Sequence, residues 1–537
     1  MSPRVGCLAA VLSLLVCATA GALTIHVPDD YLTIQEGIDA ASSGDTVLVA
    51  CGTYYNESPI NDPITIDVSG ITLRSETGEA DCATLDGLDL TPGFRLVLVD
   101  STTTVMGFTI TRTTPFVMST AQTGGMEILG GAPRIENVEF IDNAGPSNAL
   151  GASGLYCDDC SSTITNVVFE DNTGLAASIG GEATLRHAVF SENHGSAHGG
   201  ALHCDADATI EDVVFDRNIS TANGGAFYCD HGQPHLVDVG FYENESDGKG
   251  GAIYCWGATA QPRFTRVAIE DNTAGASGGG MYFYLGCDPM LEDVTFLRNA
   301  AGDSGGGLYA CGAVSPILTD VEFIENTAVG DGGGIACRGA CALDIDRATV
   351  SGNSAARGGG MYCGNADARL RNACVVENTA DDGGGLFFDG VCSPEVTYTT
   401  IADNDAGVGA GASCDILADL TLEHSIVALN GPGAAVDCSF LSDASLACCD
   451  VYGNAGGDYY GCLSGQEGQN NNFSADPLFC QTANPGDPYS LHEDSPCLGA
   501  PCYRIGARDA GCTGDPSTDV IENAEPVSWS FIKGMYR

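Results

Sequence analysis

Apolar and polar residues alternate in two short phrases that recur along the middle of the chain. The first phrase is Val-x-Phe-x-x-Asn, as at Val138–Asn143, Val167–Asn172 and Val213–Asn218. The second is Gly-Gly-(Ala/Gly)-apolar-x-Cys, as at Gly224–Cys229 and Gly250–Cys255. In both phrases the apolar positions are two residues apart, so they share one face of a β-strand. The pattern therefore predicts short strands and argues against helices, which need a period of about 3.6 residues.

The two phrases recur about every 26 residues, and a period of this length is typical of a solenoid. A coil of this length holds two or three short strands and closes one turn of a parallel β-helix. Equivalent residues of successive coils then stack about 4.8 Å apart. Twelve asparagines mark the repeat at spacings of 21 to 29 residues: Asn143, Asn172, Asn193, Asn218, Asn244, Asn272, Asn299, Asn326, Asn353, Asn378, Asn404 and Asn430.

Stacking in register predicts two ladders of equivalent side chains. One ladder is interior and mostly aromatic. The asparagines form the other ladder at a bend, where their amides bond to one another and to turn backbone. The glycines are expected where the chain bends tightly, with positive φ or no space for a Cβ atom. The interior ladder consists of Phe140, Phe169, Phe190, Phe215, Phe241, Ile269, Phe296 and Phe323.

The repeats also resemble those of known proteins. The pairing of Phe-x-x-Asn with Gly-Gly resembles the repeats of chlamydial-type polymorphic outer membrane proteins, and the chain resembles the right-handed parallel β-helix proteins of the pectin-lyase-like class. The resemblance implies an all-β chain, a right-handed parallel β-helix solenoid with a short N-terminal helical cap and a Cys-rich C-terminal cap. Residues 24–55 look like the opening of such proteins, with Ile34, Ile38 and Ala41 at helical spacing. Four later stretches look like the closing coils: Asp476–Phe479, Tyr489–Leu491, Ser495–Cys497 and Ile505–Ala507.

The chain divides into five segments, the first of which has the pattern of a signal peptide. Arg4 precedes an apolar run, and small residues follow up to Ala22. A lipoprotein site at Cys17 is disfavoured because Val16 precedes it. The protein is therefore expected to be exported, and no other stretch is apolar enough to span a membrane. The resemblance implies that it is secreted or held at the cell surface in association with an outer membrane. The segments are the signal peptide 1–22, the N-terminal cap and early coils 23–120, the regular repeats 121–435, the Cys-rich coils and cap 436–512, and the linker and tail 513–537.

The chain has 25 cysteines, a number that suits an oxidising, exported setting. Cys51 and Cys82 are expected to form an N-terminal disulfide. Zinc is not expected at Cys157–Cys160 or Cys337–Cys341, because no histidine lies at a matching spacing, and local disulfides or free thiols are favoured. Small apolar core residues are the favoured interpretation of an in-register column: Cys204, Cys229 and Cys255. Eight cysteines are expected to staple the C-terminal cap: Cys438, Cys448, Cys449, Cys462, Cys480, Cys497, Cys502 and Cys512.

Acidic residues dominate the charge, with 71 Asp and Glu against 20 Lys and Arg and a formal net charge of −51. A field of this sign makes nucleic acid and anionic membranes poor partners. Acidic residues also precede eight of the twelve ladder asparagines, and the favoured interpretation is a solvated surface. The alternative is a saline habitat or Ca²⁺ held between successive coils, and no other cofactor is expected. The eight are Asp142, Asp171, Glu192, Glu243, Asp271, Glu325, Glu377 and Asp403.

We assign no catalytic residue from the sequence. A polysaccharide lyase of this fold needs a base beside Ca²⁺-binding acids, and Arg263 and Arg266 match no lyase motif. A hydrolase needs clustered aspartates near a His-Gly, but Asp158–Asp159 and His231–Gly232 lie about three coils apart. Five histidines on neighbouring coils are explained as well by an exposed surface: His194, His198, His203, His231 and His235. A lyase or glycoside hydrolase acting on acidic polysaccharide therefore stays the alternative function.

The glycine phrase also predicts a surface feature, because its x position lies between two inward residues and faces outward. On four successive coils this position is tyrosine: Tyr228, Tyr254, Tyr282 and Tyr309. An exposed stripe of these rings is a candidate carbohydrate-binding site, since sugars stack on aromatic faces. The alternative is an external ladder that stabilises the sheet. The sequence thus favours a secreted or cell-surface β-helix with an adhesive, binding or structural role toward a polysaccharide or host glycan, and leaves its oligomeric state open.

Overall fold

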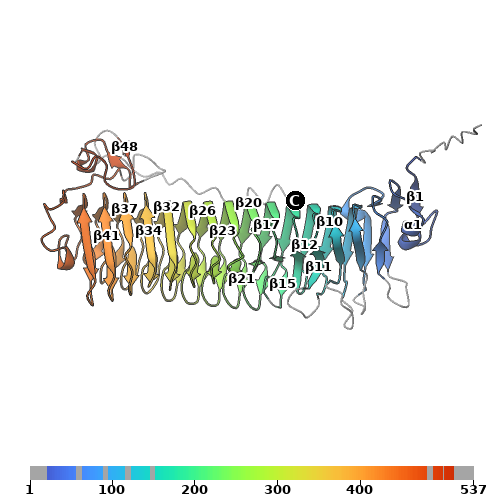
Figure 1. Ribbon diagram of the computed structural model, residues 1–537, viewed down its shortest axis with the longest axis horizontal. Helices are drawn as coiled ribbons and strands as arrows, with labels where there is room; N and C mark the ends of the chain where they lie inside the picture. The colour runs from blue at the N-terminus through green and yellow to red at the C-terminus, as the bar shows by residue number, and fades with distance from the viewer. Residues whose placement is uncertain are drawn as a thin grey trace, which may run out of the picture.

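A computed structural model shows the chain as a long β-rod (Figure 1). It describes residues 21–55, 63–88, 95–114, 123–145, 151–196, 198–480, 488–499 and 501–512. These residues wind into about 15 turns of a parallel solenoid with only 4% helix, which confirms the predicted all-β parallel β-helix. Apart from Gly21 and Ala22, the predicted signal peptide lies outside the described residues, as does the predicted linker and tail at 513–537.

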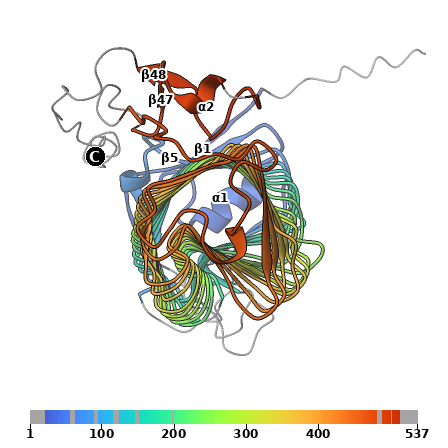
Figure 2. The same ribbon diagram turned by 90° about the vertical axis from the view of Figure 1, so that its left-hand side faces the viewer.

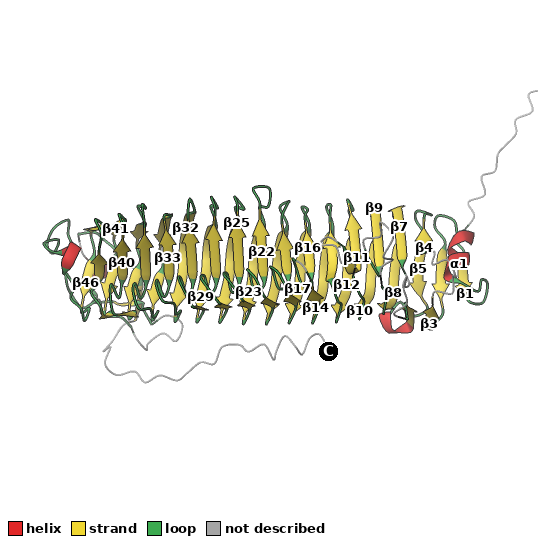
Figure 3. Cartoon of the chain, turned by 90° about the horizontal axis from the view of Figure 1, so that it is seen from below, coloured by secondary structure: helices red, strands yellow, loops and turns green. Residues whose placement is uncertain are grey.

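Sheets A and B run the length of the rod, and their strands pair in parallel from one coil to the next (Figure 3). In the described residues sheet B has 15 strands: β4 (Ile64–Ile66), β7 (Leu96–Ser101), β9 (Met126–Gly131), β11 (Ala152–Asp158), β13 (Leu175–Ile179), β16 (Leu202–Cys204), β19 (Phe227–Cys229), β22 (Ile253–Trp256), β25 (Met281–Tyr284), β28 (Leu308–Cys311), β31 (Ile335–Arg338), β33 (Met361–Gly364), β36 (Leu386–Asp389), β40 (Ala412–Asp415) and β44 (Val436–Cys438).

Sheet A holds the Val-x-Phe phrases and has 23 strands in the same residues: β1 (Thr24–Val27), β2 (Thr46–Val49), β3 (Gly52–Tyr55), β5 (Thr72–Ser75), β6 (Ala83–Asp86), β8 (Thr104–Thr111), β10 (Arg134–Ile141), β12 (Thr163–Glu170), β14 (Thr184–Ser191), β17 (Thr209–Asp216), β20 (His235–Tyr242), β23 (Arg263–Glu270), β26 (Met290–Leu297), β29 (Ile317–Ile324), β32 (Ala342–Ser351), β34 (Asp367–Arg371), β35 (Cys374–Val376), β37 (Glu395–Thr397), β38 (Thr400–Ala402), β41 (Asp419–Glu423), β42 (Ile426–Ala428), β45 (Asp443–Ala447) and β46 (Asp450–Tyr452). The much shorter sheet C consists of β15 (His194–Gly195), β18 (Ile219–Ser220), β21 (Glu245–Ser246), β24 (Thr273–Ala274), β27 (Ala300–Ala301) and β30 (Thr327–Ala328).

The predicted interior ladder is present and fully buried. Phe140 of β10 pairs in register with Phe169 of β12, and the same register continues through the regular coils. Neighbouring phenylalanine rings stack with centroids 4.4 to 4.8 Å apart. Ile269 replaces one ring without breaking the register, since it lies beside Phe241 and Phe296.

Each long strand of sheet A contains a bend that the sequence did not predict. In β10 the bend lies at Asn137, which has φ of 53°. It interrupts the alternation of inward and outward residues: two residues separate the buried Ile135 from the buried Val138, whereas one separates Val138 from the buried Phe140. The equivalent residues of the later coils have φ between 49° and 57°. These residues are Asn166, His187, Asp212, Asp238, Arg266, Asp293, Asp320, Arg347, Asn372, Tyr398, His424 and Cys448.

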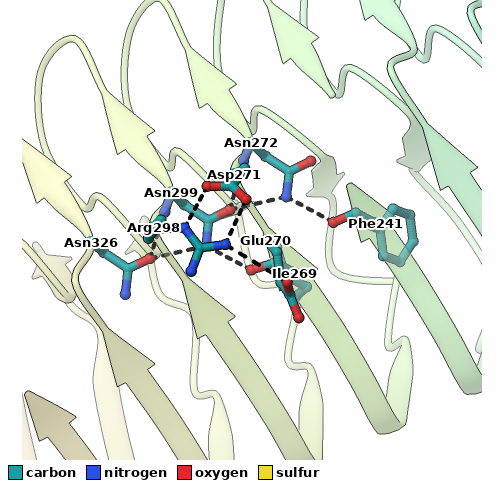
Figure 4. Close-up of polar contacts among 8 residues, drawn as sticks. All are labelled: Phe241, Ile269, Glu270, Asp271, Asn272, Arg298, Asn299 and Asn326. Carbon is teal, nitrogen blue, oxygen red and sulfur yellow. Dashed lines mark hydrogen bonds and ion pairs between the residues drawn. The ribbon is translucent and has the colours of Figure 1, made fainter. Parts of the chain in front are cut away.

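The twelve asparagines form the predicted second ladder, and each side chain is buried. Figure 4 shows three of them, Asn272, Asn299 and Asn326. The Asn272 carbonyl oxygen accepts from the backbone N–H and the side-chain amide of Asn244, both at 2.9 Å. The Asn272 amide donates to the Phe241 carbonyl and to the Asn299 side chain, both at 3.0 Å. The residue before each ladder asparagine has φ between 51° and 67°, which forms the expected bend. The ladder continues to Asn454, which the sequence reading missed.

The glycine phrase bends as expected. Gly224 has φ of 67°, a conformation that costs glycine little. A Cβ atom on Gly225 would lie 2.1 Å from the carbonyl oxygen of Gly251 in the next coil. The first glycine therefore supplies the backbone conformation, and the second lets neighbouring coils approach.

The acidic column before the asparagines is interrupted by cations. Arg217 pairs with Glu192 at 2.5 Å, and Arg298 makes two hydrogen bonds to Asp271 at 2.7 and 2.8 Å. In the part of the chain that the structure describes, one group of potential metal ligands gathers within 4.8 Å: His424, Cys448 and Cys502. Its two cysteines form a disulfide with each other, so they offer no thiolate to a metal.

A short helix closes the N-terminal end of the rod, as predicted. Helix α1 (Ile34–Ala40) begins at Thr33, whose hydroxyl accepts from the Glu36 backbone while the Glu36 carboxylate accepts from the Thr33 backbone. Ile34 and Ile38 are buried, and α1 lies within the outline of the coils when the rod is viewed along its axis (Figure 2). Among the described residues no helix has the length and apolar character needed to cross a membrane.

The disulfides follow the predicted distribution, except that two of the eight C-terminal cysteines, Cys449 and Cys497, form no disulfide in the structure. Cys51 pairs with Cys82, and Cys157–Cys160 and Cys337–Cys341 are local bridges. Six of the eight C-terminal cysteines pair: Cys438 with Cys462, Cys448 with Cys502 and Cys480 with Cys512. The interior cysteines at 204, 229 and 255 are free and buried, as expected of core residues.

The last described residues fold back on the outside of the rod (Figure 2). This C-terminal segment, residues 473–480, 488–499 and 501–512, includes β47 (Leu491–His492), α2 (Pro496–Gly499) and β48 (Ala510–Cys512). Its apolar side chains pack on the outer face of β35, β38 and β42, in a cluster separate from the interior core. The Tyr489 hydroxyl lies 3.1 Å from a Glu377 carboxylate oxygen and 3.0 Å from an Asp403 carboxylate oxygen, and its one hydrogen is shared between these acceptors, which fixes the segment to the acidic column.

A buried carboxyl group makes this attachment sensitive to pH. Asp450 of β46 accepts from the Ala475 N–H at 3.0 Å and from the Cys497 thiol at 3.2 Å. Burial raises the pKa of Asp450 to about 7. The pKa of Asp450 in the folded protein lies above the ordinary value of 3.8. The contribution of this carboxyl group to stability is therefore complete below pH 3.8 and is lost as the pH rises through about 7.

We therefore expect the C-terminal segment to open more readily at about pH 8 than at about pH 5. Proteolysis or hydrogen exchange of residues 488–512 would measure this. Asp450→Asn keeps the acceptor for Ala475 and should lose most of the pH dependence. An unchanged dependence in that variant would place the titrating group elsewhere.

Candidate functional site on sheet B

Four tyrosines lie in register on the outer face of sheet B. They come from the consecutive strands β19, β22, β25 and β28, and we call them the tyrosine column: Tyr228, Tyr254, Tyr282 and Tyr309. The flanking residues of each phrase, such as Phe227 and Cys229, point into the core. The column belongs to a hydrophobic cluster separate from that core, which confirms that these side chains face outward.

The expectation that this column is an exposed stripe is wrong. Tyr228, Tyr254 and Tyr282 are only 6, 8 and 3% exposed. Their rings stack on one another with centroid distances of 5.8 and 5.3 Å, and Tyr309 follows at 5.0 Å. Ring faces that already contact neighbouring rings are not free for a sugar. The column therefore has the geometry of an external ladder that stabilises the sheet.

Residues from the preceding loops cover the column. The His198 ring stacks on Tyr228 with centroids 4.9 Å apart. Lys249, one of two lysines in the chain, lies 4.7 Å from the Tyr282 ring centroid and donates to the Tyr282 hydroxyl at 3.1 Å. Burial raises the pKa of Tyr254 and of Tyr309 to about 12, so both remain neutral phenols.

A second outward position provides the exposed aromatic surface. Trp256 and Tyr284 end strands β22 and β25, two residues beyond Tyr254 and Tyr282, and pair in register with each other. Trp256 is 37% exposed, and Tyr284 is partly exposed. The Trp256 indole N–H donates to the Tyr228 hydroxyl, and Lys249 lies 5.7 Å from the Tyr284 ring centroid. Sequence reasoning missed this pair, although extending the alternation of each strand by one step finds it.

Histidines meet an aspartate beside this pair. Asp230 precedes Trp256 by one coil and accepts from His203 at 3.1 Å and from His231 at 3.2 Å. Burial alone would raise the pKa of Asp230, but the two histidines outweigh it and hold that pKa below its usual value. Burial also lowers the pKa of His198. This end of the site therefore offers a carboxylate and imidazole N–H groups as hydrogen-bonding partners.

Further along sheet B, two aromatic rings are held by arginines. Tyr362 and Phe387 stack with centroids 5.6 Å apart. Arg338 and Arg357 lie 4.7 and 5.1 Å from the Tyr362 centroid, and Arg357 also donates to the buried Asp331 at 2.8 Å. Because Asp331 engages both arginines, their charge is partly neutralised.

The sequence candidates for catalysis stay apart. Asp158–Asp159 ends β11 and His231–Gly232 follows β19, with strands β13 and β16 between them. Arg266 makes two hydrogen bonds to Asp238 at 2.7 and 2.8 Å on sheet A, whereas the tyrosine column belongs to sheet B. The structure thus gathers aromatic and hydrogen-bonding groups on sheet B without bringing these candidates together.

The repeating unit that builds this face has a known counterpart. Three segments match the Chlamydia polymorphic membrane protein repeat. The matches cover residues 212–230, 241–255 and 320–338. The first and third matches contain both an asparagine phrase and a glycine phrase. The matched repeat therefore coincides with the repeating unit that these two phrases define in the sequence.

Comparison with solved structures gives a distant likeness. The catalytic unit of the thermostable GH87 alpha-1,3-glucanase from Streptomyces thermodiastaticus strain HF3-3 is similar at 15% identity and a TM-score of 0.34. The alignment covers 79% of this chain and 69% of the glucanase chain. No curated protein matches. A likeness at this level describes neither a site nor a reaction.

Proposed function

We propose that the protein is a secreted or cell-surface β-helix that binds a polysaccharide or a cell-surface glycan in an adhesive or structural role. The polymorphic membrane protein repeats support association with an outer membrane or a cell surface. The net charge of −51 argues against nucleic acid as the partner. No Ca²⁺ or other cofactor is required by this proposal.

The observation that carries the proposal is the pair Trp256 and Tyr284 beside Lys249. Exposed aromatic rings bind the apolar faces of sugars, and polar groups around them fix the orientation of the ligand. Lys249 offers a cationic donor to a hydroxyl or a uronate carboxylate, and Asp230 offers an acceptor. The tyrosine column acts here as the support beneath the pair and is no longer proposed as the stacking surface itself.

We expect Trp256→Ala to weaken binding to an immobilised polysaccharide about tenfold, because it removes the largest exposed ring of the site. A panel of neutral and uronate-containing polysaccharides would identify the ligand. Trp256→Phe is the matched control, since it keeps an aromatic face. The double variant Tyr254→Ala with Tyr282→Ala should instead lower the melting temperature clearly.

Two outcomes would contradict the proposal. Binding that is unchanged in Trp256→Ala would exclude the exposed pair as the site. Release of an unsaturated, ultraviolet-absorbing product or of new reducing ends would establish the enzyme alternative instead.

A further inference from the structure

Exposed apolar side chains gather at the turns that join sheet B to sheet A in the last coils. They follow β36, β40 and β44, and we call them the apolar edge: Val391, Ile416, Leu417, Phe440 and Leu441. Phe440 and Leu441 are 73 and 87% exposed. The turns are neighbours, because Gly390 N–H donates to the Asp415 carbonyl at 3.1 Å and Leu417 N–H donates to the Phe440 carbonyl at 3.3 Å.

Four of these five side chains occupy a backbone that disfavours them. Ile416 and Leu417 have φ of 51° and 67°, and Phe440 and Leu441 have φ of 46° and 68°. Bulky and β-branched residues rarely adopt such values, and glycine takes them without strain. Several earlier coils use glycine at this turn, as at Gly312 and Gly339, and Leu285 occupies it as a single apolar residue in one coil.

The apolar edge therefore does not serve the turn. Glycine or asparagine would satisfy the same backbone, and a polar side chain would suit the exposure. Two successive coils instead carry a pair of large apolar residues each. Contiguous exposed apolar residues mark interaction sites, and strained backbone is concentrated at such sites.

Acidic residues dominate the charge of the part of the chain that carries the apolar edge. The 132 residues from Asn372 to Tyr503 contain 19 Asp and Glu and no Lys or Arg. Three carboxylates lie near the edge on the side of sheet B, and two more lie in register on the side of sheet A. These are Asp389, Asp415 and Asp437, and Asp419 and Asp443.

We propose that the apolar edge binds a polypeptide segment of a partner protein that combines Leu or aromatic side chains with Lys or Arg. The apolar residues supply the buried contact, and the surrounding carboxylates select a cationic partner and steer its approach. A second copy of this chain would bring the same carboxylates to the contact. A membrane with anionic headgroups is repelled by the same field.

The test uses the full chain and a short fluorescent peptide in which Leu alternates with Lys. The double variant Phe440→Asn with Leu441→Gly removes two large contacts and gives the turn residues that fit its backbone. It should weaken peptide binding about tenfold without lowering the melting temperature. Leu285→Asn is the matched control, because Leu285 has φ of 54° and is 45% exposed at the same turn of a central coil. The affinity of this control variant for the peptide should equal that of the parent chain.

Four results would overturn the proposal. Equal peptide affinity in the double variant and the parent chain would exclude the edge. Equal binding of a peptide with Ser in place of Leu would leave charge as the whole interaction. A dimer in sedimentation that the double variant abolishes would make a second copy the occupant. A higher affinity for phosphatidylcholine vesicles, measured by co-sedimentation, than for the peptide would make a membrane the occupant. Each readout is independent of Trp256 and of carbohydrate binding.

Discussion

Phe241→Asp is expected to destabilise the central coils by at least about 5 kcal/mol, because it removes a packed ring and buries a carboxylate without a partner. Phe241 is fully buried, and its ring lies 4.7 Å from that of Phe215. Its other neighbour in the ladder is Ile269, so no polar group in the ladder offers compensation. In a solenoid each coil is stabilised by the two beside it, and the damage should spread to the neighbouring coils.

Denaturant unfolding followed by far-ultraviolet circular dichroism would measure the loss. The control is Glu243→Lys, two residues further on, where the side chain is exposed and a change of about 0.5 kcal/mol or less is expected. Equal effects of the two substitutions would contradict the assignment of inward and outward faces in sheet A.

Asn272→Ala is expected to lower the free energy of unfolding by about 3 kcal/mol or more. The loss comes from buried polar groups that are left without hydrogen-bond partners, and lost apolar contact contributes little. The substitution leaves the Asn244 backbone N–H and the Phe241 carbonyl without the bonds that Asn272 makes at 2.9 and 3.0 Å. It also breaks the chain of amides on both sides, toward Asn244 and toward Asn299. These groups are buried, so water does not replace the lost bonds.

The melting temperature and the hydrogen exchange of the neighbouring coils would test this expectation. Asn166→Gly is a suitable control, since Asn166 is exposed at the bend of β12 with φ of 53°, which glycine adopts freely. A loss for Asn272→Ala no greater than for this control would mean that the asparagine ladder contributes little to stability.

The sequence predicted the ladders because each is built from one residue type at a fixed place in the period. Phe140 and Asn143 recur with the same spacing in coil after coil, so their stacking follows from the repeat alone. The bend at Asn137 escaped notice because its equivalents include His187, Arg266 and Cys448, which share a backbone conformation and no side-chain chemistry. The backbone conformation recurs at this position, but the residue type does not.

The tyrosine column shows a different limit. Alternation along β19 and β22 correctly placed Tyr228 and Tyr254 on the outer face, but alternation does not say what covers that face. The cover comes from His198 and Lys249, which lie in loops that precede the strands. Contacts of this kind depend on how far each loop extends, and the period carries no information about that.

The asparagine ladder has a direction, and the direction makes the coils interchangeable. One hydrogen of every ladder amide donates to the asparagine of the next coil, and the other donates to a backbone carbonyl of the preceding coil. Within the ladder, each asparagine therefore presents its side-chain oxygen to the coil before it and a side-chain N–H to the coil after it. The row begins where Thr113 donates to Asn143 and ends where Asn454 donates to the Asp458 carboxylate at 2.8 Å. Removal of one whole coil would join a donor side to an acceptor side again, whereas removal of part of a coil would not. The length of such a rod is therefore free to change in whole coils while both ends keep the same terminating groups.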